Sequence, residues 1–326
     1  MKFIEVNRQL NLKDCYCLIK SLDKKMTKTG KPYLDLTLSD ATGDISAKLW
    51  DYDELKHSSL EVNMPVKVRG SLEEFKGKDQ LRVNQIRPLL ESDDFDISEL
   101  VASSPEDSGW MLNEIKRIVA AFGDEELKKI VNYLLDERGK ALLSAPAAVN
   151  MHHAVRGGLL FHTISMLRVA QRICEVYPFL DKELLLSGVI IHDLAKIDEM
   201  EINDLGLANK YTVQGELVGH LVKGAEQVAK AAEKLNISPE TSILLEHMVI
   251  SHHGVPEFGA AKLPSFPEAE VLSVIDNLDA TLFEFMAAIN DINVGEFSSR
   301  QWALDNRKIY NHGRTFGTAP QANVKE

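Results

Sequence analysis

Residues 184–193 are Leu-Leu-Leu-Ser-Gly-Val-Ile-Ile-His-Asp. The first eight are apolar on every side apart from one serine, and a helix of this kind is buried in the core of a protein. His192 and Asp193 therefore stand at the end of a buried helix, where an unpaired charge costs several kcal/mol. Such a pair must be hydrogen-bonded or must bind a metal.

Further pieces of the chain carry the same residue types, namely His162, His220, His252-His253 and Asp276. Taken alone, each histidine is more often a hydrogen-bonded core or surface residue than a metal ligand. Histidines and acids that recur together on successive predicted helices indicate a site for one or two divalent metals. Asp279 is left outside this set, as a solvated or helix-facing acid.

The donor types narrow the choice of metal. Imidazole and carboxylate ligands without a thiolate suit Mn²⁺, Co²⁺, Fe²⁺ or Mg²⁺ better than a closed structural zinc site. Lys196 lies four residues after His192 on the same helical face and is a candidate for contacting a phosphate oxygen, although a solvated lysine at a helix end has similar weight. Arg156, in a glycine-rich turn, is a further phosphate candidate.

Composition places the chain among folded proteins of two domains: it has 326 residues, of which 44% are hydrophobic and 26% charged. No apolar stretch approaches the roughly 20 residues of a membrane helix, and the N-terminus lacks the apolar core of a secretory signal, so we expect a cytoplasmic protein without membrane contact. The net charge of −12 is uneven, because residues 11–90 hold 14 basic and 12 acidic residues. A polyanion must therefore meet a local patch.

The pattern along the chain divides it into four segments. Period-two alternation predicts five strands, at about residues 13–25, 33–39, 45–50, 65–73 and 80–87, with a short helical piece at 51–55. This is the order of an OB-type five-stranded β-barrel, which we assign to residues 1–90. Residues 91–108 hold seven acidic residues and no basic ones, as in a linker. We expect a helical domain over 109–312, with one hairpin formed by 199–203 and 210–213, and a mobile tail over 313–326.

OB barrels bind single strands by stacking bases on aromatic rings beside basic loops. Any one aromatic is more often core, and any one lysine is more often merely solvated. The clustering of such residues near two predicted loops favours nucleic-acid binding. The candidates are Tyr33, Trp50 and Phe75 for stacking, and Lys28, Lys31, Lys76, Lys78 and Arg82 for phosphates.

The order His162, His192-Asp193, Asp276 resembles the HD-domain metal phosphohydrolases, and His220 with His252-His253 resembles their two-metal members. Together with the barrel, about residues 12–312 resemble the YhaM-type 3′-to-5′ exoribonucleases. The stretches that carry this resemblance are His152-His153-Ala154, Gly157-Gly158-Leu159, His162-Thr163, His192-Asp193-Leu194-Ala195-Lys196-Ile197, Gly215-Glu216-Leu217, Gly219-His220, Ser251-His252-His253-Gly254 and Asp276-Asn277-Leu278-Asp279-Ala280.

The resemblance implies two metal sites. One metal would be held by His162, His192, Asp193 and Asp276. A second would share Asp193 as a bridge and add His220 and His252. His253 would instead orient a phosphate or a ligand, and which member of the His252-His253 pair coordinates stays open. Asp193, Lys196 and His253 are then the candidate catalytic residues.

The resemblance also implies an activity: two divalent ions, Mn²⁺ foremost, that support 3′-to-5′ removal of nucleoside 5′-monophosphates from single-stranded RNA, with single-stranded DNA as a further substrate. The preference for RNA and the expected homo-oligomer rest on the resemblance. Two rival hypotheses are a phosphodiesterase or nucleotidase for a small nucleotide, with the barrel as a regulatory or oligomer module, and a non-catalytic nucleic-acid adaptor. The complete ligand set argues against the adaptor, and the basic loops at 24–31 and 76–82 favour a polymer substrate.

Overall fold

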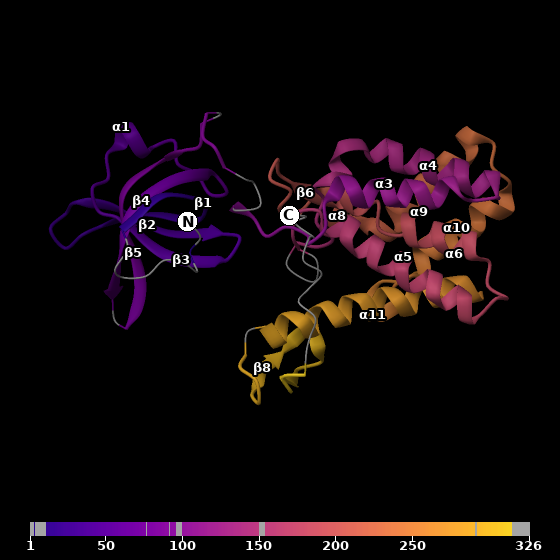
Figure 1. The fold of residues 1–326 in the computed structure, drawn as a ribbon. Coiled ribbons are helices and arrows are strands. Elements are labelled where there is room, and N and C mark those ends of the chain that lie inside the picture. Colours follow the sequence, from indigo (N-terminus) through magenta and orange to yellow (C-terminus); the bar gives the residue numbers. More distant parts are fainter. Residues whose placement is uncertain are drawn as a thin grey trace. The chain divides into compact units, whose positions relative to one another are not determined.

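The computed structural model (Figure 1) describes residues 3, 11–75, 77–90, 92–95, 100–149, 154–290 and 292–314, with only the backbone at residues 11–13, 78 and 209. Two compact units, Met1–Ser103 and Ser104–Glu326, each have a hydrophobic core of their own. The boundary falls inside the acidic segment 91–108. Lys76, the side chain of Lys78 and residues 315–326, most of the predicted tail, lie outside the described residues.

The first unit is a closed barrel of five strands in the order β1-β2-β3-β5-β4. All neighbours are antiparallel except β3 and β5, which are parallel. A short helix, α1 (Glu54–His57), lies between β3 and β4 in the chain. The predicted OB-type barrel is thus confirmed, with strands β1 (Asn11–Met26), β2 (Pro32–Asp40), β3 (Gly43–Leu49), β4 (Pro65–Phe75) and β5 (Lys78–Pro88).

Alternation of side chains along each strand builds the barrel core. In β2, Leu34, Leu36 and Leu38 are buried while the residues between them are half-buried on the outer face. Gly70 marks a bulge in β4, where a Cβ atom would lie 2.3 Å from the backbone oxygen of Arg82. A residue without a side chain is required for this close approach of two strands.

The second unit is mainly helical, as expected for residues 109–312. Its α-helices are α3 (Ser108–Ala120), α4 (Glu125–Arg138), α5 (Gly158–Val176), α6 (Lys182–Ile191), α7 (Lys196–Glu199), α8 (Val213–Leu217), α9 (Gly219–Leu235), α10 (Pro239–Ser251) and α11 (Pro267–Asn290). Short 3₁₀ helices accompany them at Gly139–Leu143, Pro256–Phe258 and Trp302–Leu304. Within the described ranges, no helix is long and apolar enough to cross a membrane.

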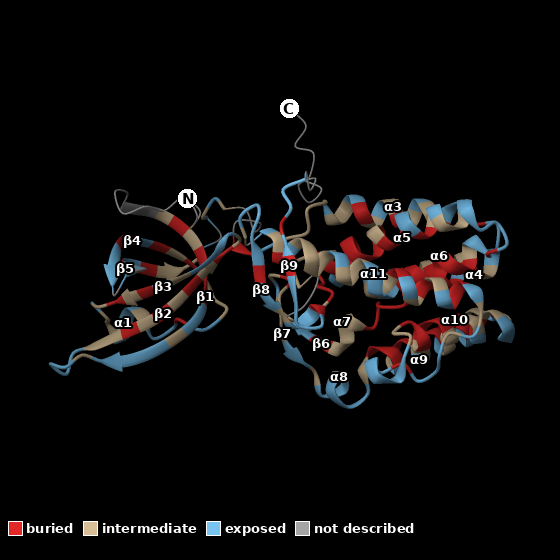
Figure 2. Cartoon of the chain, turned by 90° about the horizontal axis from the view of Figure 1, so that it is seen from below, coloured by how far each residue is buried: buried red, intermediate tan, exposed pale blue. Residues whose placement is uncertain are grey.

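Helix α6 lies at the centre of this unit, as its sequence predicts. Residues 184–191 are all buried, and Figure 2 shows buried residues concentrated on α6 and on the helix faces around it. The side chain of Asp181 caps the helix by accepting hydrogen bonds from the backbone N–H groups of Glu183 and Leu184. Met248 of α10 packs where a Cβ at Gly188 would lie, so α6 and α10 approach closely.

Two details of the helical unit differ from the sequence prediction. The hairpin consists of β6 (Met200–Ile202) and β7 (Ala208–Tyr211), and the second strand ends earlier than predicted because the Thr212 side chain caps α8. A second hairpin, β8 (Phe297–Gln301) and β9 (Arg307–Tyr310), was not predicted. Its alternation is weak, since Ser298 is the one buried residue of β8.

Candidate metal centre and nucleic-acid interface

Two helices end in the same way and deliver two histidines to one place. His192 follows the last residue of α6, and its Nδ1 lies 2.8 Å from the backbone oxygen of Val189. His252 follows the last residue of α10, and its Nδ1 lies 2.7 Å from the oxygen of Val249. A carbonyl oxygen can only accept a hydrogen bond, and at a helix end it has no partner within the helix. Nδ1 therefore carries the hydrogen in both rings, and the lone pair is on Nε2.

Three other elements complete the cluster. His162 belongs to α5 and Asp276 to α11, and His162 Nε2 lies 3.2 Å from Asp276 Oδ1. His220 is in α9, although the sequence of residues 215–222 is compatible with one continuous helix. Gly219, with φ +74°, instead separates α8 from α9, since glycine adopts this backbone conformation readily.

Asp193 lies between the histidines, and its two oxygens face different ones. Oδ2 is 3.3 Å from His192 Nε2 and 3.8 Å from His162 Nε2. Oδ1 is 3.4 Å from His220 Nε2 and 3.6 Å from His252 Nε2. This is the arrangement of a carboxylate that can bridge two cations.

His253 joins the same side of the cluster. Its ring centroid lies 4.5 Å from that of His252 and 5.1 Å from that of His220. Ligand atoms of His220, His252 and His253 lie within 4.8 Å of one another, as do those of His162, His192 and Asp193, and those of His192, His252 and Asp276. Both members of the His252-His253 pair are thus near His220, and both have the geometry of a ligand.

The cluster contains polar atoms that protein groups leave unsatisfied. The Nε2 atoms of His192, His220 and His252 and the Oδ1 atom of Asp193 are buried and form no hydrogen bond. Buried polar atoms without partners are rare in proteins, and each one costs free energy. Imidazole nitrogens and a carboxylate oxygen gathered in this way fit divalent cations, which would satisfy these atoms.

The ionisation of the cluster follows from burial and charge. Burial lowers the pKa of His220 and of His252, which favours the neutral ring that binds metals. Burial raises the pKa of Asp193, but Lys196 and His192 outweigh it and hold the pKa well below its usual range. Burial lowers the pKa of His162, yet hydrogen bonds to Asp276 and Asp279 raise it to about 9. At this ring a proton and a cation compete for Nε2.

Two acids that the sequence interpretation omitted belong to the site. Asp279 was taken as a solvated or helix-facing acid, but its Oδ2 lies 2.7 Å from His162 Nδ1 and its side chain is 17% exposed. It follows Asp276 by three residues in α11, so both project from one face of that helix. Glu199 lies at the end of α7, and both its carboxylate oxygens are 3.0 Å from His220 Nδ1.

The two phosphate candidates lie in different surroundings. Lys196 Nζ is 2.7 Å from Asp193 Oδ2, and the lysine side chain is 13% exposed. Burial lowers the pKa of Lys196, but Asp193 and Asp276 outweigh it and raise the pKa, so the amine is charged. Arg156 is packed against the turn of the β6–β7 hairpin at Gly206, where its Nη1 is buried without a hydrogen-bond partner.

The barrel carries an aromatic pair on its outer surface. The rings of Tyr33 and Trp50 have centroids 4.7 Å apart, and Lys48 Nζ lies 5.2 Å from the first centroid and 5.7 Å from the second. Lys48 pairs in register with Arg82 of β5, so both side chains extend from the same face. Lys48 was missed by the sequence analysis, although it stands two residues before Trp50 in an alternating strand.

Four further predicted nucleic-acid residues, among those whose side chains the structure describes, are exposed. Phe75 is 55% exposed at the end of β4. The Arg82 side chain is 51% exposed, and its Nη1 is 3.5 Å from Glu73. Lys28 is exposed in the β1–β2 turn, and Lys31 Nζ lies 3.1 Å from Asp51. The structure thus brings Tyr33, Trp50 and Arg82 to one face.

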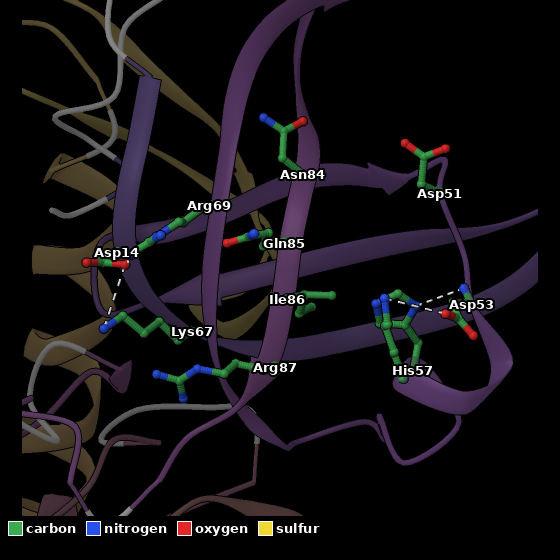
Figure 3. Close-up of a pocket in the computed structure, with 11 residues that line it drawn as sticks. Asp14, Asp51, Asp53, His57, Lys67, Arg69, Asn84, Gln85, Ile86 and Arg87 are labelled. Atoms are coloured by element: carbon green, nitrogen blue, oxygen red, sulfur yellow. Dashed lines mark hydrogen bonds and ion pairs between the residues drawn. The ribbon is translucent and has the colours of Figure 1, made fainter.

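A hollow of about 730 Å³ lies elsewhere on the barrel, over β4 and β5 (Figure 3). Lys67, Arg69 and Arg87 line it, but carboxylates already pair with each of them. Asp14 accepts from Arg69 at 2.7 Å, and Asp93 accepts two hydrogen bonds from Arg87 at 2.7 Å. Carboxylates pair with cations of the Tyr33 face as well, such as Asp35 with Lys48 at 3.1 Å. The Tyr33–Trp50 ring pair has no counterpart among the residues that line the hollow, so the Tyr33 face is the better candidate for binding a single strand.

Comparisons with known proteins agree with this division. Residues 19–89 match the model of an OB-fold nucleic acid binding domain, and residues 159–281 match the model of the HD domain. All six predicted metal ligands lie within the second range. The second OB-fold domain of replication protein A from Methanococcus maripaludis is 17% identical over 29% of this chain and 98% of that chain, with a TM-score of 0.22, which adds nothing to the assignment. The fold and the site define an OB-fold protein with an HD hydrolase domain that depends on a divalent metal.

Curated relatives match nearly the whole chain. The 3′-5′ exoribonuclease YhaM of Bacillus licheniformis is 38% identical over 94% of this chain and 96% of its own length. The proteins of the same name from Geobacillus sp. (strain WCH70) and Bacillus subtilis (strain 168) are 39% and 37% identical over 94% of this chain, and 93% and 96% of their own lengths. The chain belongs to the YhaM 3′-5′ exoribonuclease family.

Proposed function

We propose that this protein removes nucleoside 5′-monophosphates one at a time from the 3′ end of single-stranded RNA, with two divalent ions bridged by Asp193. The observation that carries this proposal is the orientation of the Asp193 carboxylate. One oxygen faces His162 and His192, and the other faces His220 and His252. A carboxylate between two sets of nitrogen donors suits a pair of cations rather than one.

The charge of the site supports the same number of ions. Asp193, Asp276, Asp279 and Glu199 contribute four negative charges, and Lys196 contributes one positive charge. When every histidine of the site is neutral, one divalent ion would leave the site negative, whereas two would make it positive. A phosphodiester is an anion, so only the second state attracts the substrate. Oxygen and imidazole donors suit Mn²⁺, Co²⁺, Fe²⁺ and Mg²⁺, and the family resemblance favours Mn²⁺ among them.

Divalent ions at such a site supply Lewis acidity, which activates a water molecule and neutralises charge on phosphoryl oxygens. The protein's own groups hold the substrate. The charged amine of Lys196 would donate to a nonbridging oxygen of the scissile phosphate, and His253, at the edge of the cluster, would either orient that phosphate or join the ligands. One water molecule is consumed: its oxygen would form the new bond to phosphorus, the bond from phosphorus to the 3′-oxygen of the penultimate nucleotide would break, and that oxygen would leave with a proton from the water.

The barrel accounts for a polymer substrate. Tyr33 and Trp50 offer a stacking surface that any base can use, and Lys48 and Arg82 lie beside it for the phosphates. The relatives named as exoribonucleases support RNA as the substrate of this chain. Stacking on aromatic rings does not depend on the sugar, so we propose single-stranded DNA as a second substrate. We also propose, from the family resemblance, that the protein acts in the cytoplasm as a homo-oligomer, which sedimentation analysis would test.

The decisive experiment uses two labels on one oligoribonucleotide. A radioactive phosphate at the last internucleotide linkage should appear at once as a nucleoside 5′-monophosphate. A label at the 5′ end should give a ladder that shortens with time. Both products should require Mn²⁺ and should be absent with Asp193→Asn. Release from the 5′ end, or internal fragments of fixed size, would refute the proposal, and hydrolysis of bis(p-nitrophenyl) phosphate without trimming would favour the small-nucleotide alternative.

A further inference from the structure

The histidines of the metal centre have two kinds of hydrogen-bond partner at Nδ1. His192, His252 and His253 each direct Nδ1 to a backbone carbonyl, at distances of 2.7–2.8 Å. His162 and His220 direct Nδ1 to a carboxylate instead, Asp279 in the first case and Glu199 in the second. Neither acid is among the residues whose ligand atoms lie close enough together to hold a metal ion.

The two carboxylate-held histidines lie on opposite sides of Asp193. His162 faces Asp193 Oδ2 and Asp276, whereas His220 faces Asp193 Oδ1. His220 has the rings of His252 and His253 as neighbours, while the His162 ring has that of His192. Each acid therefore acts on a different half of the centre.

Glu199 is fixed in place by its surroundings. Its Oε1 accepts a hydrogen bond from the backbone N–H of His220 at 3.0 Å, in addition to the contact with the ring. Its backbone oxygen accepts from Thr212 N at 2.8 Å, and a Cβ on Gly215 would lie 2.2 Å from that oxygen. The β6–β7 hairpin and α8 therefore clamp Glu199 against His220.

Asp198, the residue before Glu199, anchors the same short helix, α7. Asp198 Oδ2 accepts from Arg138 Nη1 at 2.8 Å and from Gln227 Nε2 at 2.6 Å. Helix α7 has only four residues and could not hold a side chain in position by itself. These tethers make it a rigid support for the Glu199 carboxylate.

We propose that Glu199 and Asp279 are positioning residues that set the affinities of the two metal sites independently, Glu199 through His220 and Asp279 through His162. This inference rests on the proposed two-metal function. A carboxylate can only accept a hydrogen, so it fixes the ring with its lone pair on Nε2, and its charge makes that nitrogen a stronger donor to a cation. An amide in its place can rotate to donate, which would favour the opposite tautomer.

The test uses the full-length protein, from which a chelator has removed all metal. Calorimetry then measures how this protein binds Mn²⁺. Glu199→Gln should weaken one of two binding steps by about 10- to 100-fold and leave the other unchanged, and Asp279→Asn should do the same to the other step. Glu201→Gln, in the exposed hairpin, and Glu270→Gln, exposed on α11, are matched controls and should bind as the wild type does.

Electron paramagnetic resonance supplies a second measurement. Two Mn²⁺ ions that share Asp193 should give a coupled spectrum, and each variant should show an isolated-ion spectrum at the Mn²⁺ concentration that saturates the wild type. Excess Mn²⁺ should restore the coupled spectrum and the turnover rate. Thermal unfolding of the metal-free variants should match that of the controls.

Three outcomes are decisive. Unchanged binding in both variants, or equal weakening of both steps in either one, would overturn the inference while leaving the two-metal site intact. A wild-type protein that binds only one ion would overturn the proposed two-metal function itself.

Discussion

Lys196 Nζ lies 2.7 Å from Asp193 Oδ2, and both side chains are almost entirely removed from solvent. The two residues do not share a helix with His192, as the sequence predicted for Lys196, because α6 ends at Ile191 and a turn leads to α7. A buried ion pair of this kind is costly to form, because both charges lose their hydration, so its presence is weak evidence for a role in stability alone. The placement of Lys196 beside the bridging carboxylate puts a positive charge where a phosphate would bind. The lysine is therefore a candidate for stabilising charge during the reaction.

Replacement of Lys196 tests this role. Lys196→Met keeps the length of the side chain and removes the charge, so we expect kcat to fall by roughly 10²- to 10³-fold, as for the loss of one donor to a developing anion. Bound Mn²⁺ should be retained, as measured by elemental analysis. Lys230→Met, on the exposed face of α9, is the control. Wild-type turnover by the Lys196 variant would exclude the residue from the chemistry.

The aromatic pair on the barrel predicts a loss of RNA affinity on truncation. Trp50→Ala should weaken binding of a short single strand by about 1–3 kcal/mol, or roughly 5- to 150-fold, because stacking of one base is lost. Fluorescence anisotropy with the Asp193→Asn protein measures this without cleavage. Tyr16→Ala removes an aromatic beside Lys67, at the hollow rather than at the pair, and should leave affinity nearly unchanged. Equal losses in both variants would argue against the Tyr33–Trp50 face.

Salt dependence separates two arginines of similar exposure. Arg82 has a side chain 51% exposed beside Lys48, and Arg69 has one 54% exposed and paired with Asp14. If RNA phosphates contact the first, Arg82→Gln should reduce the slope of log K against log salt by about 0.7, the value for one phosphate of a single strand. Arg69→Gln should leave the slope unchanged. A wild-type affinity that does not vary with salt would contradict the phosphate contacts altogether.

Local patterns explain which parts of the structure the sequence could predict. The buried helix before His192-Asp193 is a continuous apolar run, and the barrel strands alternate with period two, so both follow from neighbouring residues alone. The β8–β9 hairpin lacks such alternation, because most of its residues are exposed. Contacts with α11 stabilise this hairpin, and the local sequence pattern of the hairpin does not predict them.

The omitted acids show the same limit at the site. Asp279 and His162 are 117 residues apart, and their contact depends on how α11 packs against α5. An acid three residues after a predicted ligand was a visible signal for Asp279. Glu199 offered a similar one, since it stands three residues after Lys196. In both cases the residue type was evident, but the direction of the side chain required the packed fold.

Metal removal should act on the helical unit alone. The unsatisfied atoms of His192, His220, His252 and Asp193 all belong to that unit, so ions bound there stabilise its folded state and not that of the barrel. A free Mn²⁺ concentration 100-fold above the dissociation constant should add about 2.7 kcal/mol per site to the free energy of unfolding. Calorimetry should show two unfolding transitions, of which only one moves to higher temperature with Mn²⁺.

The double variant His192→Ala, Asp193→Ala should lose that shift and its bound metal, while the barrel transition and RNA binding stay as in the wild type. A barrel transition that moves equally with Mn²⁺ would show that the ions bind elsewhere.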